Sequence, residues 1–192
     1  PIYAKYGDKT IYVKDIPALG WKVIDKAETE DAVTVSDRKI ENKHYIVTFD
    51  ENYSIVSLFD KDNDREVINK GGKGNVICAY EDMPRQYDNW EISNYYVDKK
   101  YVLDKVESIK QIEKDGGFGF EITRKYNESV IRQYVLLYPE SRRIDIKNDI
   151  DWHENQVLLK AEFDVDIHST RASYDVQFGN TERNTHQNTS WD

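Results

Sequence analysis

The strongest chemical signal in the sequence lies at 81–92, where Tyr87, Asp88 and Trp90 fall within four residues. An aromatic ring can pack against the C–H face of a pyranose, and a neighbouring carboxylate can accept hydrogen bonds from the sugar hydroxyls. This combination is therefore typical of a sugar-binding surface. An aromatic plug of the core beside an exposed acid would explain the same residues, and the sequence leaves both readings open.

A second segment of this kind is 178–192, which is polar, rich in Asn and Thr, and bounded by aromatic residues. Like 81–92, it breaks the alternation of apolar and polar residues that packs a sheet, so core packing does not explain it. A structural loop is the alternative. The two segments together give five candidate substrate-pocket residues: Tyr87, Asp88, Trp90, Arg183 and His186.

The sequence contains no recognisable motif for a metal or for catalysis. Its four histidines are scattered without the close pairing common among zinc ligands, and Cys78 is the only cysteine. Acidic residues are abundant, so a carboxylate pair for acid–base work is possible but unspecific. The run 71–74 lacks the ending of a phosphate-binding loop and is predicted to be a turn. We therefore predict neither catalytic residues nor a metal site within this chain.

The elements that must position these segments are strands. Alternation of apolar and polar residues with a period of two recurs along the chain. One strand is predicted with Tyr45, Val47 and Phe49 on the same face. Another is predicted with Phe120 and Ile122 on one face and the charged residues of 119–126 on the opposite face. Loop-forming clusters separate the runs at about the 8–12-residue spacing of antiparallel sandwiches. The stretch 154–163 has the length of a helix, but it leads into an alternating run and is predicted to be a strand. The further predicted strands are 75–80, 130–138, 143–150, 163–167 and 172–178.

The first part of the chain differs from the rest. Residues 1–38 are predicted to hold short strands near 10–13, 21–24 and 32–35, with a turn at 17–20, as a small β subdomain or a set of edge strands. Residues 39–192 are predicted to form a β-sandwich. The chain starts at Pro1, which indicates a piece of a longer polypeptide unless an initiator Met was removed before the proline.

Charge and composition exclude several classes of protein. The 192 residues carry a net charge of −9, without the basic clusters that bind nucleic-acid backbones. The mean hydropathy is −0.80, and no run approaches the ~20 apolar residues that cross a membrane. No secretory leader opens the chain, and a single cysteine is compatible with a reducing compartment. We expect a cytoplasmic protein.

Several segments, in the same order along the chain, resemble the C-terminal β region of the α-mannosidases of glycoside hydrolase family 38, in the bacterial and cytosolic branch. No single segment would be specific, but their joint order is. The match begins with Lys14-Asp15-Ile16-Pro17-Ala18-Leu19-Gly20-Trp21. The sharpest segments are Tyr87-Asp88-Asn89-Trp90-Glu91-Ile92, Trp152-His153-Glu154 with Leu158-Leu159-Lys160, and Gln177-Phe178-Gly179 together with 183–192.

The resemblance implies the following. Such enzymes carry a zinc ion, an Asp nucleophile and an Asp acid/base in an N-terminal α/β domain, which this chain lacks. The chain would then be a non-catalytic part whose partners are its own catalytic domain and the α-mannoside substrate. It would form a large antiparallel sandwich similar to galactose mutarotase, incomplete at its C-terminal side and able to self-associate through the open edges. The alternative is a free-standing β-sandwich that binds carbohydrate or protein.

Overall fold

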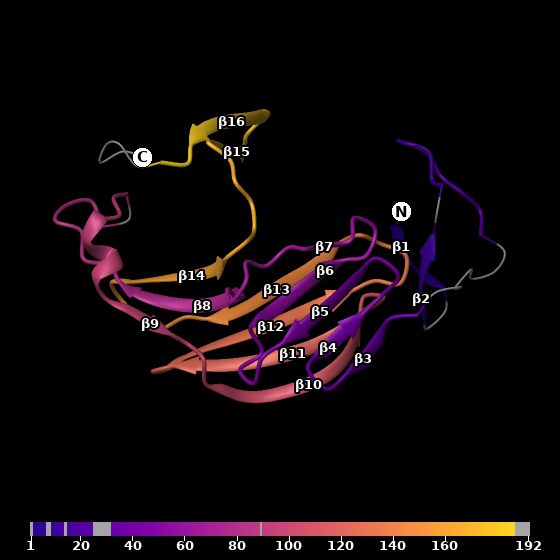
Figure 1. Cartoon of the computed structure of the whole chain (residues 1–192), viewed down its shortest axis with the longest axis horizontal. Coiled ribbons are helices and arrows are strands. Elements are labelled where there is room, and N and C mark those ends of the chain that lie inside the picture. The colour runs from indigo at the N-terminus through magenta and orange to yellow at the C-terminus, as the bar shows by residue number, and fades with distance from the viewer. Residues whose placement is uncertain (1, 7–8, 14, 25–31, 89, 187–192) are drawn as a thin grey trace.

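The computed structural model describes residues 2–6, 9–13, 15–24, 32–88 and 90–186. The described residues form antiparallel strands and one short 3₁₀ helix, and two sheets stacked face to face make a sandwich (Figure 1). The predicted all-β antiparallel sandwich is confirmed. No helix in the described part of the chain is long and apolar enough to cross a membrane.

The larger sheet has eight strands. Its main order is β14-β8-β6-β5-β4-β3, while β7 pairs with β6 and β9 pairs with β8. The strands are β3 (Thr34–Ser36), β4 (Lys39–Glu41), β5 (Tyr45–Phe49), β6 (Ile55–Asp60), β7 (Arg65–Glu66), β8 (Gly74–Glu81), β9 (Lys100–Val102) and β14 (Val157–Phe163). The ambiguous stretch 154–163 is thus a strand from Val157 onward, as predicted.

The smaller sheet is a four-stranded meander in the order β10-β11-β12-β13. Its strands are β10 (Val106–Lys114), β11 (Gly117–Tyr126), β12 (Ser129–Leu137) and β13 (Ile144–Asp151). Two-residue turns join β10 to β11 and β11 to β12, residues 138–143 join β12 to β13, and each strand pairs with its neighbour in sequence.

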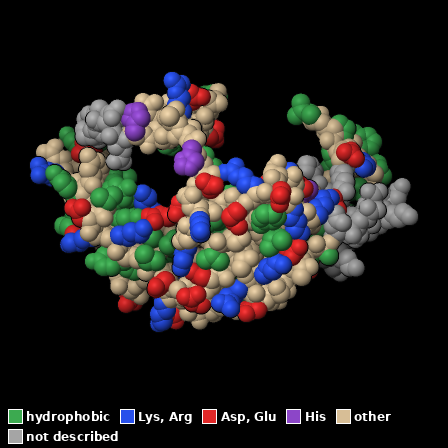
Figure 2. Space-filling view, viewed as in Figure 1, with side chains coloured by type: hydrophobic (Ala, Val, Ile, Leu, Met, Phe, Trp, Pro, Cys, Tyr) green, Lys and Arg blue, Asp and Glu red, His purple; other side chains and the backbone are tan. Residues whose placement is uncertain are grey.

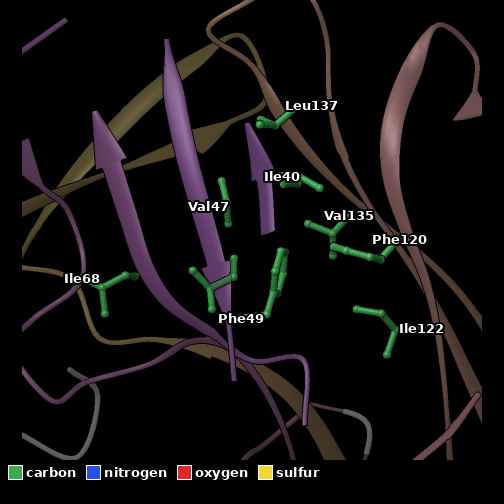
Figure 3. Close-up of a cluster of buried hydrophobic side chains, with 9 residues drawn as sticks. Ile40, Val47, Phe49, Ile68, Phe120, Ile122, Val135 and Leu137 are labelled. Carbon is green, nitrogen blue, oxygen red and sulfur yellow. The ribbon is translucent and has the colours of Figure 1, made fainter. Parts of the chain in front are cut away.

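The main core lies between the two sheets. Val47 and Phe49 from the larger sheet meet Phe120 and Ile122 from the smaller one, and all four side chains are buried. Figure 3 shows these side chains pointing toward one another from the two sheets. The rings of Phe49 and Phe120 meet edge to face, with centroids 5.4 Å apart. The alternation predicted for β5 and the apolar face predicted for β11 are therefore confirmed.

One prediction for β11 was wrong. Arg124, expected on the charged outer face, lies in the same register as Phe120 and Ile122 and is only 1% exposed. Its guanidinium donates to Gln133 Oε1 at 3.0 Å and to the Asn52 carbonyl oxygen at 2.5 Å. The core tolerates this long charged side chain because both oxygens accept hydrogen bonds from its guanidinium inside the fold.

Two hairpins lie outside the sandwich. The first joins β1 (Ile2–Tyr6) to β2 (Lys9–Val13), and the second joins β15 (Arg171–Val176) to β16 (Gly179–Asn184). In Figure 1 the second hairpin stands above β8 and β14, at the end of a rising connection from β14.

Three predictions of local structure need correction. Residues 21–24 form no strand, although the predicted turn at 17–20 is present and is closed by a hydrogen bond from Gly20 N to Pro17 O. The run 163–167 forms no strand of its own: Phe163 ends β14, and Val165 makes one isolated bridge with Ile68. The start of 178–192 is not a loop, because Gly179–Asn184 pairs with β15.

Candidate functional site

The segment that carries Tyr87, Asp88 and Trp90 is the excursion between β8 and β9, residues 82–99. Its base is closed on the larger sheet by hydrogen bonds from Glu81 N to Lys99 O at 3.1 Å and from Asp82 N to Gln156 O at 2.8 Å. The Lys99 ammonium also pairs with the Glu81 carboxylate at 2.7 Å. We call residues 82–99 the β8–β9 loop.

The tip of this loop is held in shape by Tyr87. Its carbonyl oxygen accepts hydrogen bonds from Trp90 N at 2.7 Å and Glu91 N at 3.0 Å. Tyr87 has a φ of 54°, a left-handed conformation that is uncommon for a bulky residue. Such strain persists only where the surroundings fix it, and it gathers at functional sites.

The side chains at the tip face solvent. Tyr87 is 68% exposed and Trp90 is 87% exposed, and Asp88 is exposed as well. The alternative of an aromatic core plug is therefore not what the structure has. Large rings held this far from the core are available for a ligand or another domain.

Asp82 is the second carboxyl group of the loop, and it was not among the residues selected from the sequence. Burial raises its pKa, and the negative charge of Asp88 adds to this effect. Its Oδ1 is buried and has no hydrogen-bond partner among the described residues. Because a buried acceptor without a donor is costly, this oxygen is suited to a donor from outside the described chain.

Arg183 lies on the β15–β16 hairpin. The register pairs Ala172 with Arg183 and Tyr174 with Thr181, so these side chains share one face of the hairpin. The opposite face carries the ion pair between Arg171 and Glu182, 3.0 Å apart.

The hairpin is almost entirely exposed to solvent. Of its described residues only Ala172 is half-buried, and Phe178 at the turn is 99% exposed. An open hollow of about 670 Å³ is lined by Tyr174, Val176 and Arg183 with neighbouring residues of both strands. A two-stranded hairpin with exposed apolar side chains is marginal alone, so this one is suited to a covering partner.

The structure does not join the two predicted segments directly. No hydrogen bond or ion pair links 82–88 or 90–99 with 171–186 within the part of the chain described. Figure 2 shows an opening between the hairpin and the body of the sandwich. His186 is exposed just after β16, and residues 187–192 of the second segment lie outside the described residues.

The side chains that could ligate a metal ion are dispersed over the described residues. Within the described ranges, no three His, Cys, Asp or Glu side chains come together as a set that could hold a metal ion. The donor set for a zinc ion is thus not found in the described residues. Cys78 is buried, and burial raises the pKa of its thiol, so it is not a ready thiolate ligand either.

Comparison with known proteins agrees with this architecture. Residues 40–192 match the family described as "Glycosyl hydrolases family 38 C-terminal domain", and the chain belongs to this family. The chain is 30% identical over 168 residues to "Alpha-mannosidase 2C1" of Mus musculus, an alignment that covers 86% of the chain. It is also 30% identical over 164 residues to "Alpha-mannosidase G" of Dictyostelium discoideum, covering 81% of the chain.

The chain is short beside these relatives. It spans 16% of the length of the mouse protein and 15% of the Dictyostelium protein.

Proposed function

We propose that this chain is the non-catalytic β-sandwich part of an α-mannosidase that hydrolyses terminal α-mannosides. The family membership supports this, because the matching family is a C-terminal domain and both relatives above are named as α-mannosidases. The sandwich would lie mainly within residues 39–192, with β3 (Thr34–Ser36) from the first part of the chain as an edge strand of its larger sheet, and the β1–β2 hairpin would be a small β subdomain beside it.

In this proposal the β8–β9 loop and the β15–β16 hairpin face the catalytic domain of the same polypeptide and border its mannoside pocket. The observation that carries the proposal is the exposure of Tyr87 and Trp90 on a loop whose backbone is fixed. The exposed rings would pack against the sugar, Asp88 would accept from its hydroxyls, and Arg183 and His186 would donate. The buried, unpartnered oxygen of Asp82 fits contact with a donor of that domain.

The remaining parts of the proposal concern the whole polypeptide. A zinc ion would be held by the catalytic domain, since the described residues of this chain do not group ligands for it. The enzyme would be cytoplasmic and of the bacterial and cytosolic branch. The separated sandwich would self-associate through its open strand edges.

The test uses the full-length polypeptide and an aryl α-mannoside. We expect Asp88→Ala and Arg183→Ala each to lower kcat/KM by at least about 10-fold, or about 1.4 kcal/mol of transition-state stabilisation. The unfolding temperature should barely change, because both side chains are exposed. Matched controls are Asp98→Ala in the same loop and Arg132→Ala on β12, which should keep kcat/KM.

A variant at Asp88 or Arg183 that loses several degrees of stability and keeps kcat/KM would show a structural role instead. If the full-length polypeptide does not hydrolyse the substrate, and the 192-residue chain alone binds mannosides, the free-standing binding module is the correct function.

A further inference from the structure

The β8–β9 loop is docked on the outer face of the larger sheet at one point between its base and its tip. A 3₁₀ helix, η1 (Asn94–Asp98), follows the tip, and none of its residues is fully buried. Tyr95 and Val97 are exposed, whereas Tyr96 is half-buried. The ring of Tyr96 meets the ring of Tyr80 on β8 edge to face, with centroids 5.2 Å apart and planes at 70°.

The ammonium group of Lys160 on β14 completes this contact. Its Nζ donates to the Tyr96 hydroxyl at 2.8 Å. The same Nζ lies 4.7 Å from the centroid of the Tyr96 ring and 5.5 Å from that of Tyr80. A cation held against two rings attracts both, and more strongly where water is partly excluded, so Lys160 binds the loop to the sheet.

Neighbouring charged groups hold the Tyr80 hydroxyl in place. Tyr80 donates its hydroxyl to Glu162, and the Lys100 ammonium lies 2.5 Å from the same carboxylate. Burial opposes ionisation of Glu162, but the hydrogen bonds from Lys100 and Tyr80 outweigh it and lower its pKa. Glu162 is thus hydrogen-bonded to Lys100 and Tyr80, and the Lys160 ammonium acts on it only through its charge, while the hydrogen bond from Lys160 goes to the Tyr96 hydroxyl.

We infer that Lys160 is a positioning residue for substrate, which acts through Tyr96 to hold the loop that presents Tyr87, Asp88 and Trp90. This rests on the proposed function of that loop. Lys160 itself points at η1 and not at the tip, so it does not touch the sugar. Its loss should loosen the wall of the pocket while leaving the chemistry elsewhere intact, which raises KM more than it lowers kcat.

The test compares Lys160→Met and Lys160→Arg in the full-length polypeptide, with Lys110→Met as control. Lys110 is also a strand lysine with one partner, Glu121, at 3.1 Å. Hydrogen exchange should show a loss of protection of about tenfold at the amides of Tyr96, Trp90 and Glu91 in Lys160→Met, with the core strands unchanged. KM should rise about fivefold with kcat within about twofold, and Lys160→Arg, which keeps the cation, should restore both protection and KM.

The outcomes test the docking role of Lys160 and the proposed function of the loop separately. Unchanged protection in Lys160→Met overturns the inference whatever the activity does. Lost protection with an unchanged KM overturns it too, provided Asp88→Ala impairs the enzyme. If protection is lost and Asp88→Ala has no effect, the docking role stands and the proposed function of the loop fails. If Lys160→Met does not fold, Tyr96→Phe decides by the same measurements, because it removes only the hydroxyl that accepts from Lys160.

Discussion

Inside the sandwich, Arg124 Nη1 of β11 donates to Gln133 Oε1 of β12 at 3.0 Å, and both side chains are 1% exposed or less. The amide of Gln133 continues the network from its Nε2, which donates to Asn75 Oδ1 at 3.1 Å and to Asn148 Oδ1 at 2.8 Å. Gln133 is therefore the hub that connects a buried cation to both sheets. Removing a hub leaves several buried groups without partners at once.

We expect Gln133→Leu to destabilise the fold by about 2–4 kcal/mol, because Arg124 and Asn75 each lose a buried partner. Urea unfolding measures this change. The matched control is Gln111→Leu on β10, where the side chain is exposed and the change should stay within about 0.5 kcal/mol. Equal effects of the two substitutions would show that the network contributes nothing beyond a surface contact.

The burial of Arg124 also shows that alternation of polar and apolar residues does not predict every buried side chain. Alternation placed Phe120 and Ile122 on the core side of β11 correctly, and the next residue in that register is Arg124. A pattern of polarity predicts that a charged residue faces solvent, whereas the side chain of Gln133 on the next strand and the carbonyl of Asn52, 72 residues away, accept hydrogen bonds from Arg124 inside the fold. Strand formation likewise depends on finding a pairing partner: 21–24 alternates but forms no strand, whereas the polar 179–184 pairs with the adjacent 171–176.

Gly119 marks a close approach between β11 and β12. A Cβ at this position would lie 1.9 Å from the carbonyl oxygen of Val135, which is backbone and cannot turn aside. We expect Gly119→Ala to destabilise the fold by about 2–3 kcal/mol through displacement of the strands. Thermal unfolding of Gly179→Ala, where nothing lies within 4 Å of the added Cβ, is the control and should show little change. A stable Gly119→Ala protein would mean that the two strands are further apart.

Glu66 makes the fold sensitive to acid. Burial opposes ionisation of Glu66, but hydrogen bonds from the Ser57 hydroxyl and from the backbone N–H groups of Ile68, Leu58 and Val67 outweigh it, so its pKa is lowered from 4.5. A carboxyl whose pKa is lower in the folded state adds stability above its unfolded pKa. This stability is lost as the pH falls through the folded pKa.

We therefore expect the unfolding temperature to fall as the pH goes from about 5 to 3, and to fall less steeply in Glu66→Gln. At pH 7 this variant should be less stable by about 1 kcal/mol, because the charged acceptor is gone. Glu113→Gln, an exposed glutamate on β10, should follow the unmodified protein throughout. The same slope in all three proteins would contradict a role for Glu66.

The sequence was enough to select the rings of Tyr87 and Trp90, but it did not predict the contacts that hold their loop on the sheet. The proximity of Tyr87, Asp88 and Trp90 is visible in the chain itself, and the proline before them signals a break in the strand. The contact of Tyr96 with Lys160 spans 64 residues, so no local pattern contains it. Arg183 was selected from its segment as a pocket residue, yet the face it shares with Tyr174 depends on the register of a hairpin that the sequence does not reveal.

The last prediction concerns the 192-residue chain on its own. Retaining glycosidases need two carboxyl groups about 5–5.5 Å apart on either side of the glycosidic bond, one as nucleophile and one as acid and base. In the β8–β9 loop, Asp82 is half-buried, and burial, with the negative charge of Asp88 added, raises its pKa. A half-buried acid without an opposing carboxylate across a pocket cannot carry out this displacement. We expect no detectable hydrolysis of an aryl α-mannoside by the isolated chain, with or without added zinc, under conditions where the full-length polypeptide turns over. Hydrolysis that survives repurification and disappears in Asp82→Asn or Asp88→Asn would show that the chain has a catalytic centre of its own.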